Sequence, residues 1–257
     1  MDRFATPNHI ECLDWLSLSR SENIGPITFF QLIRRFGTAA APLEAVPELD
    51  RHGGCKRPIR LLEPSKAEQE ADAIANVGAH LLTVLGRTEM LRGQEPTVWI
   101  VGARNASGAG RRIAQGIAKD LGGRGIIFAS GLALGIDTSA HNGALKTGTI
   151  AVVAGGGWMF FYPPGNEELQ VAISAQGALI SEKPMGTEPQ TRHFPRRNRL
   201  ILGLSMGVLV VEAAARSGSL TTARTALEQG REVFAVPGSP LDPRAQGTNH
   251  LLRQGAS

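Results

Sequence analysis

The stretch that decides the fold is Thr97–Gly110, which reads TVWIVGARNASGAG. Its first five residues are apolar and β-branched around a Trp, a composition typical of a buried parallel strand. The strand pattern ends at Gly102, and Ser107 or Asn105 is placed to cap a helix whose apolar residues recur every four positions. A strand, a glycine turn and a helix in succession present free backbone N–H groups to an anion. We therefore expect an anion to bind at this turn.

Two common nucleotide-binding motifs are missing from the turn. No Lys follows the glycines at the spacing of a P-loop, so we expect no ATP hydrolysis. A dinucleotide site needs GxGxxG and an acidic residue after the next strand, but Arg104 replaces the second glycine and the next strand ends in Ser130-Gly131. We therefore expect no nicotinamide cofactor. Arg104 suits a phosphate, or it is solvated at the sheet edge, and the residues alone leave both open.

The strand–turn–helix unit repeats to the end of the chain. Helical patterns separate apolar strand patterns at 97–101, 126–129, 149–154, 178–181, 207–211 and 232–236. This alternation predicts an α/β fold with a doubly wound, mostly parallel sheet of the extended Rossmann type. Ligands of such sheets bind outside the carboxyl ends of the strands. Several glycine turns along that edge favour an extended anion, and these turns lie at 102–104, 130–135, 155–157 and 217–219.

The residues before about 60 have a different pattern. We expect them to form a small helical domain (1–60) ahead of the α/β domain (61–257). Apolar residues at helical spacing cover 11–46, interrupted by a Gly25-Pro26 turn, and a further helix and a strand are expected near 67–75 and 80–85. Helix pairs around a short turn occur in modules that bind a DNA backbone and in plain bundles, and both remain open.

Composition and charge limit the possible classes. No apolar run approaches the length of a membrane span and no signal peptide is evident, so we expect a cytoplasmic protein without a membrane partner. Cys12 and Cys55 have no metal-like spacing and are expected to be free thiols. Residues 95–257 carry 16 Lys and Arg against 11 Asp and Glu, whereas residues 1–94 carry 11 against 12. The basic excess accompanies the glycine turns, as expected for a polyanion binder.

The stretch Thr191–Arg199, TRHFPRRNR, is the second unusual feature. It surrounds Phe194 and Asn198 with four arginines, at 192, 196, 197 and 199. Arginine neutralises phosphates and an exposed Phe offers a stacking face to a base, a combination found in proteins that bind single-stranded nucleic acid. The same residues would also suit a solvated basic loop that Phe194 anchors to the core.

Groups with catalytic potential are few. Asp137 and His141 share a helix face but have no third ligand nearby, so we expect no metal. No GxSxG motif occurs. Glu212, at the end of the strand pattern 207–211, is the one carboxylate placed like a catalytic residue. It could equally hold the turn by accepting backbone N–H groups.

Four blocks of the sequence resemble the DprA/Smf family of DNA processing proteins. They read GARNASGAG, SGLALGID, HFPRRNRLILGLS and VLVVEAAARSGSLTTARTALEQGREVFAVPGSPLDPRAQGTN. The resemblance covers roughly 97–257, and the N-terminal region is similar to the family's small helical domain of the sterile-alpha-motif type. It implies a non-catalytic, cofactor-free protein that binds single-stranded DNA, forms a homodimer and helps to load the RecA recombinase during natural transformation. Many members also carry a C-terminal winged-helix-like domain.

Carried over residue by residue, the resemblance implies a DNA groove in which Arg104 and Arg197 hold phosphates. The expected groove residues are Gly102, Arg104, Ser130, Gly131, Gly135, Phe194, Arg196, Arg197, Asn198, Gly218 and Ser219. The resemblance also places a self-association surface, with a RecA contact close by, at His250, Leu251 and Leu252. The alternative there is that both leucines pack against the sheet.

An enzyme is the competing class. Nucleotide phosphoribohydrolases share this fold, and Glu212 would then be catalytic. In those enzymes the glycine turn precedes the catalytic Glu, whereas here Glu212 precedes the glycine turn. An assay for release of free base from a nucleoside monophosphate separates the two classes.

Overall fold

The computed structural model describes residues 9–24, 26–52, 59–76, 82–93, 95–156, 162–183 and 187–257. The chain divides into two compact units, Met1–Leu81 and Leu82–Ser257. This division lies later than the boundary expected near residue 60, because helix α4 (Pro64–Asn76) packs against helix α1 (His9–Arg20). Arg20 of α1 also pairs with Glu70 of α4 at 2.8 Å.

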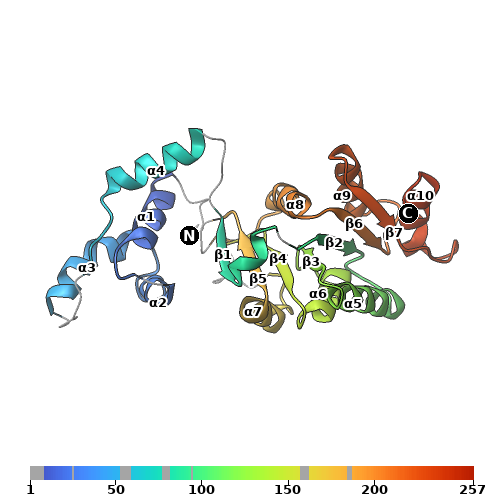
Figure 1. Cartoon of the computed structure of the whole chain (residues 1–257), viewed down its shortest axis with the longest axis horizontal. Helices are drawn as coiled ribbons and strands as arrows, with labels where there is room; N and C mark the ends of the chain where they lie inside the picture. The colour runs from blue at the N-terminus through green and yellow to red at the C-terminus, as the bar shows by residue number, and fades with distance from the viewer. Residues whose placement is uncertain are drawn as a thin grey trace. The chain divides into compact units, whose positions relative to one another are not determined.

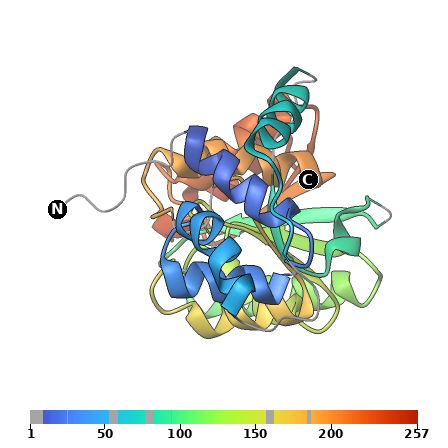
Figure 2. The same ribbon diagram turned by 90° about the vertical axis from the view of Figure 1, so that its left-hand side faces the viewer.

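The first unit is helical, as the apolar spacing predicts. Besides α1 and α4 it contains α2 (Pro26–Phe36) and α3 (Ala40–His52), coloured blue to teal in Figure 2. Its core gathers Leu18, Ile24 and Ile33, and the rings of Trp15 and Phe29 lie 5.5 Å apart beside them. Gly25 and Cys55 lie outside the described residues.

The second unit contains a seven-stranded sheet in the order β1-β5-β4-β3-β2-β6-β7. All neighbours pair in parallel except β1, which is antiparallel to β5 at the edge. The predicted α/β class with a doubly wound, mostly parallel sheet is therefore confirmed. The strands are β1 (Thr83–Gly86), β2 (Thr97–Gly102), β3 (Ile127–Ser130), β4 (Thr149–Val152), β5 (Ala178–Ser181), β6 (Gly207–Val211) and β7 (Glu232–Ala235).

Helices cover both faces of the sheet (Figure 1). One face carries α5 (Gly108–Gly122), α6 (Ile136–Ala144) and α7 (Glu167–Gln176), and the other carries α8 (His193–Leu204), α9 (Gly218–Glu228) and α10 (Gln246–Arg253). The described part of the second unit also contains the short 3-10 helices η1 (Thr88–Leu91) and η2 (Pro243–Ala245).

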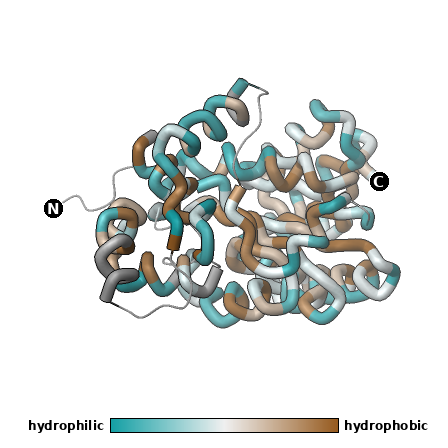
Figure 3. The backbone as a smooth tube through the Cα atoms, turned by 60° about the vertical axis from the view of Figure 1, so that its left-hand side comes forward, coloured by the Kyte–Doolittle hydropathy of each residue, from teal (hydrophilic) through white to brown (hydrophobic). Residues whose placement is uncertain are grey.

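Both faces of the strands are buried, which explains their continuous apolar sequence. In β2, Trp99 and Val101 pack toward α8 and α9, whereas Ile100 packs toward α5 and α6. In Figure 3 the strands accordingly carry much of the brown, hydrophobic tube. Within the described ranges, no helix is long and apolar enough to cross a membrane.

The basic stretch 191–199 is mostly helical, so it is not the solvated loop that one interpretation of the sequence suggested. Helix α8 begins at His193, and His193, Arg197 and Ile201 are buried at a spacing of four residues. Pro195 is compatible with this start because the first turn of a helix needs no backbone N–H from it. The helical period of the apolar segment therefore extends back into the arginine-rich block.

The expected apolar surface near the C-terminus is also corrected. Leu251 is buried in the core formed with α8 and α9, and Leu252 packs against the same core. Only His250 of the three residues is exposed. The leucines pack against the sheet because α10 lies along β7, where they complete the hydrophobic layer.

Candidate nucleic-acid interface

The candidate site lies where the chain reverses its direction across the sheet. Strand β2 lies between β3 and β6, so the loops that follow β2 and β6 lead to helices on opposite faces. Such a switch point leaves a crevice at the carboxyl ends of the strands. The turn after β2 and the first turns of α8 and α9 meet there.

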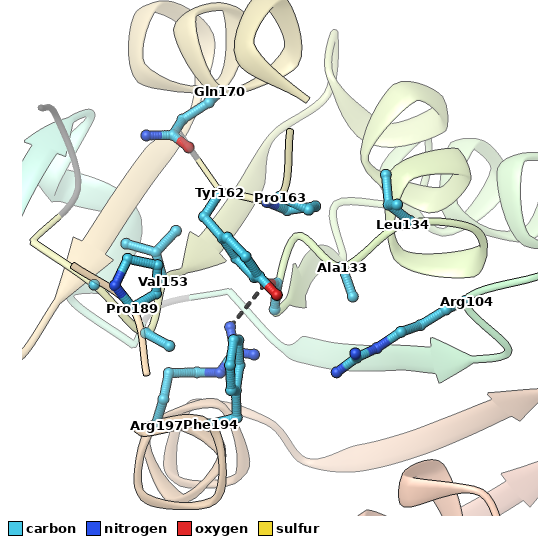
Figure 4. A pocket seen from close by; sticks show the side chains of 13 residues that line it. Arg104, Ala133, Leu134, Val153, Tyr162, Pro163, Gln170, Pro189, Phe194 and Arg197 are labelled. Carbon is cyan, nitrogen blue, oxygen red and sulfur yellow. Dashed lines mark hydrogen bonds between the residues drawn. The ribbon is translucent and has the colours of Figure 1, made fainter. Parts of the chain in front are cut away.

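Two neighbouring hollows occupy this edge. The larger, which we name the α8–α9 groove, has a volume of about 460 Å³ and is lined by β2, α8 and α9. The smaller, the Tyr162 cavity, has a volume of about 90 Å³ and is lined mainly by the ends of β3 and β4, Tyr162 and the start of α8 (Figure 4). Arg104, Ala133, Phe194 and Arg197 line both hollows, so the two form one continuous surface.

Phe194 stands at the junction between the two hollows. Its ring centre lies 5.9 Å from the guanidinium carbon of Arg104 and 5.9 Å from that of Arg197. The Tyr162 ring is tilted by 46° against it at 5.6 Å. Figure 4 shows Arg104 and Tyr162 directed toward this ring from different segments. An aromatic pair flanked by cations suits a nucleobase.

Arg104 is the exposed cation of this group. Its side chain makes no hydrogen bond or ion pair with the part of the chain that the structure describes. The guanidinium is thus available to a phosphate. Arg196 is exposed on α8, whereas Arg199 pairs with Glu182 and is partly neutralised.

Arg197 differs from Arg104 although both were expected to hold phosphates. It is 8% exposed and donates hydrogen bonds to the carbonyl oxygens of Gly131, at 2.8 Å, and of Val152. Burial lowers the pKa of Arg197 to about 10, so the group stays charged at neutral pH. A Cβ on Gly131 would collide with this guanidinium. Arg197 therefore fastens the ends of β3 and β4 to α8, which corrects its expected role as a free phosphate ligand.

The start of α9 forms the other wall of the groove. Ser217 caps the helix by accepting a hydrogen bond from the Ser219 backbone N–H at 3.2 Å. Ser219 is buried and donates from Oγ to the carbonyl oxygen of Gly102 at 3.1 Å, which ties α9 to the end of β2. Gly218 is exposed with open space around it. The positive end of the α9 dipole faces the groove here.

The remaining expected groove residues, Ser130, Gly135 and Asn198, differ in whether they reach the surface of the groove. Ser130 is fully buried and donates to the carbonyl oxygen of Ile100 at 3.2 Å, so the expectation that it contacts DNA is corrected. Gly135 lies at the cap of α6 against the backbone of Ala103 and Arg104. Asn198 accepts from Arg197 at 3.1 Å and lines the groove.

Four residues that the sequence did not single out also line these hollows. They are Leu134, which is 44% exposed, Tyr162, and Thr221 and Thr225 of α9. Residues 157–161, which precede Tyr162, lie outside the described residues. These four residues line the hollows only because the fold brings distant segments of the chain together, so the sequence carries no signal for them.

Asp137 and His141 lie on one face of α6, as the spacing predicts, and both are buried. Burial raises the pKa of Asp137, and the nearby charge of Arg197 and a hydrogen bond from the Ala133 backbone N–H oppose this. His141 Nδ1 lies 2.7 Å from Thr149 Oγ1, which itself donates to the Phe128 carbonyl. His141 therefore donates from Nδ1. Among the described residues, no three His, Cys, Asp or Glu side chains gather as a metal site would require.

The stability of this unit is expected to depend on pH through His141. Burial and the charge of Arg197 lower the pKa of His141 to about 3. Below its ordinary pKa, His141 takes up a proton in the unfolded chain but not in the folded protein, whose pKa at this group is lower. The folded state is therefore favoured above the unfolded-state pKa, and this advantage is lost as the pH falls. From pH 6.5 to 4.5 the free energy of unfolding should drop by about 2–3 kcal/mol through this group.

The measurement is denaturant unfolding of the wild type and of His141→Leu across this pH range. The variant loses stability at every pH, but its pH dependence should be shallower by close to one proton. Equal slopes for the two proteins would show that His141 titrates normally.

Glu212 accepts a backbone N–H, as in the second of the two roles considered for it, but from the turn before α5 and not from the 217–219 turn that it was expected to face. Its carboxylate accepts a hydrogen bond from the Ser107 backbone N–H at 2.8 Å and another from the Ser107 hydroxyl. It lines neither the α8–α9 groove nor the Tyr162 cavity. The carboxylate thus caps α5 and is not presented to a ligand in these hollows.

Comparison with known proteins identifies the family of this chain. A family model described as DNA recombination-mediator protein A matches residues 69–257, and one described as the DprA-like N-terminal HHH domain matches residues 10–73. DNA processing protein DprA of Bacillus subtilis is 47% identical over 161 residues, which are 62% of this chain and 54% of that protein. The chain therefore spans about half the length of this curated relative.

Two solved structures are also similar. The X-ray structure of DNA processing protein A from Streptococcus pneumoniae has a TM-score of 0.66 and 30% identity, covering 96% of this chain and 92% of that one. A structure of DNA processing protein A from Helicobacter pylori, reported for its single-stranded DNA binding mode, has a TM-score of 0.63 and 31% identity, covering 68% and 80%. From the sequence blocks, the sheet topology and these matches, this chain belongs to the DprA/Smf family of DNA processing proteins.

Proposed function

We propose that this protein binds single-stranded DNA along the α8–α9 groove and the Tyr162 cavity, without catalysing a reaction on it. The observation that carries the proposal is the ring of Phe194 at the junction of the hollows, beside the exposed guanidinium of Arg104. An aromatic face reaches a base only when the base is unstacked, so this arrangement favours a single strand over a duplex.

The phosphates would follow the carboxyl edge of the sheet. Arg104 supplies exposed positive charge beside Phe194, Arg196 adds an exposed charge on α8 outside both hollows, and the start of α9 supplies oriented backbone N–H groups at Gly218. The groove holds one buried carboxylate, Asp137, which faces the charge of Arg197. The balance of charge at the surface is therefore positive.

The hydrogen bonds of Glu212 argue against the alternative enzyme. A carboxylate that caps α5 and lies outside both hollows is poorly placed to attack a nucleotide there. The relatives are named for DNA processing, and the Helicobacter pylori protein is described by its binding of single-stranded DNA. Both support a binding protein.

We further propose that the protein helps to load the RecA recombinase during natural transformation and that it acts as a cytoplasmic homodimer. The family description as a recombination mediator supports the first part. Leu251 is unsuited to a partner surface because it is buried in the subunit, which leaves His250 as the exposed residue of the expected surface. Light scattering of the purified protein tests the homodimer directly.

The proposed function is tested by titrating a fluorescent oligonucleotide as a single strand and as a duplex at several salt concentrations. The single strand should bind more tightly. Each phosphate that is neutralised on a single strand adds about −0.7 to the slope of log K against log salt. Arg104→Ala should therefore weaken binding and flatten this slope by somewhat less than one unit.

Arg124→Ala is the matched control. Arg124 is also exposed, but it lies between α5 and β3, at the amino edge of the sheet. This variant should keep the affinity and the slope of the wild type. Equal binding of single strands by wild type and Arg104→Ala at every salt concentration would contradict the proposed groove.

A further inference from the structure

Glu212 stands out because of its backbone and its position. It follows β6 directly and has a φ of 54°, a left-handed conformation that is uncommon for residues with a side chain. Such conformations persist where the surroundings hold the residue in place. At Glu212 the surroundings are the first turn of α5.

The carboxylate is held closely against that turn. Oε2 accepts from the Ser107 N–H at 2.8 Å, Oε1 accepts from the Ser107 hydroxyl, and the same hydroxyl accepts from the Gly110 N–H at 2.9 Å. A Cβ on Gly110 would lie 2.6–2.8 Å from the carboxylate atoms, so a side chain there would displace Glu212. The negative group thus occupies the position where an anion would approach the α5 N-terminus.

These contacts hold one end of the turn that carries Arg104. The other end is held by Ser219, which donates to the Gly102 carbonyl at 3.1 Å, and by the Ile136 N–H, which donates to the Ala103 carbonyl at 3.2 Å. The side chain of Arg104 has no hydrogen bond of its own within the described residues. Its direction over the Phe194 ring therefore depends on how the two ends of the turn are held.

We infer that Glu212 is a positioning residue for DNA binding, which holds the 103–107 turn so that Arg104 faces the groove. This inference rests on the proposed function. It also implies that the turn after β2 does not itself hold a phosphate, because the anion position at α5 is occupied by the protein's own carboxylate. The DNA phosphates are left with Arg104 and the α9 side of the groove.

Whether removal of the Glu212 carboxylate strengthens or weakens DNA binding distinguishes a positioning role from a purely electrostatic one. Removing a negative group near a DNA groove strengthens binding if only its charge matters. If Glu212 positions Arg104, removing its carboxylate weakens binding instead. Glu212→Ala suits this comparison, because Ala and Glu both carry a Cβ at the same positive φ.

The experiment is a double-mutant cycle on single-stranded DNA affinity with Glu212→Ala and Arg104→Ala. We expect each single variant to weaken binding by roughly tenfold, as for one charge-assisted hydrogen bond, and the double variant to be no weaker than Arg104→Ala alone. Glu212→Gln should recover part of the affinity, because its amide oxygen can still accept the Ser107 N–H.

Arg196→Ala is the control arginine in the same cycle. Arg196 lies on α8, so its effect should multiply with that of Glu212→Ala. Affinity of Glu212→Ala equal to or above that of the wild type, or an effect that multiplies with Arg104→Ala, would overturn the inference while leaving the proposed function intact. Absence of single-strand binding by the wild type would overturn both.

A second variant covers the case in which Glu212→Ala does not fold. Ser107→Ala removes the hydroxyl that joins Glu212 to Gly110 but keeps the Ser107 backbone N–H. It should show the same coupling to Arg104→Ala, and independence from Arg104→Ala would count against the inference.

Discussion

Replacing Arg197 with Met is expected to lower the free energy of unfolding by about 3 kcal/mol, the largest stability effect that we predict for a single groove residue. The change removes the hydrogen bonds to the carbonyl oxygens of Gly131 and Val152. It also leaves Asp137 buried without the positive charge that opposes the rise of its pKa. A buried carboxylate that loses its cation is costly to keep ionised.

The pH dependence of the stability loss tests whether the buried carboxylate of Asp137 causes it. Without Arg197 the pKa of Asp137 should rise further, and a raised folded-state pKa stabilises the protein at low pH and loses that contribution as the pH increases. The deficit of Arg197→Met should therefore be smaller at pH 5 than at pH 8, as measured by denaturant unfolding. Adding Asp137→Asn should recover part of the loss at pH 8.

Arg196→Met is the matched control for stability, because it removes an exposed arginine from the neighbouring position of α8. Its effect should stay within about 0.5 kcal/mol, as for most surface substitutions. A similarly small effect for Arg197→Met, or a stability loss that does not vary with pH, would contradict the structural role proposed for Arg197.

Replacing Phe194 with Ala is expected to weaken single-stranded DNA binding by roughly 1–3 kcal/mol, as for loss of one stacked base. The ring centre lies 5.9 Å from each of two guanidinium carbons and 5.6 Å from the Tyr162 ring, and the residue is only half-buried, so a base can reach it. Because no charge is removed, the slope of log K against log salt should hardly change. Fluorescence titration at several salt concentrations measures both quantities.

Two controls separate stacking from structure. Phe234→Ala removes another partly exposed Phe, on the edge strand β7, and should leave DNA affinity unchanged. Phe194→Tyr keeps an aromatic face and should retain most of the binding. If Phe194→Ala lowered the melting temperature but the folded protein bound DNA with wild-type affinity, Phe194 would be a structural anchor only.

Local patterns of the sequence were sufficient for the architecture of the second unit. Every apolar strand pattern from 97 to 236 became a strand of the sheet, because strands buried on both faces need continuous apolar runs. The spacing also predicted the edge at which the glycine turns meet and the two hollows lie, since parallel strands place their carboxyl ends together. The start of α8 was missed because its arginines suggested a solvated loop, although their spacing already follows the helical period.

The candidate site depended more on tertiary contacts. Arg104 and Arg197 have the same side chain and the same expected role, yet one is exposed and the other is fastened to two carbonyl oxygens at the ends of β3 and β4. Leu251 is likewise part of the core because α10 packs along β7. Burial of this kind depends on which segments meet, and neighbouring residues in the sequence carry little information about it.

The sequence by itself determined the order of strands and helices, the basic charge near the glycine turns and the family blocks, because each of these is a property of consecutive residues. Only the tertiary structure decided that Tyr162 meets Phe194 and that Glu212 caps a helix 105 residues before it. It also showed that the α5 N-terminus, the first anion site suggested by the sequence, is occupied from within. The physical reason is that a hydrogen bond or ring contact requires proximity in space, and the fold brings these residues together from distant parts of the chain.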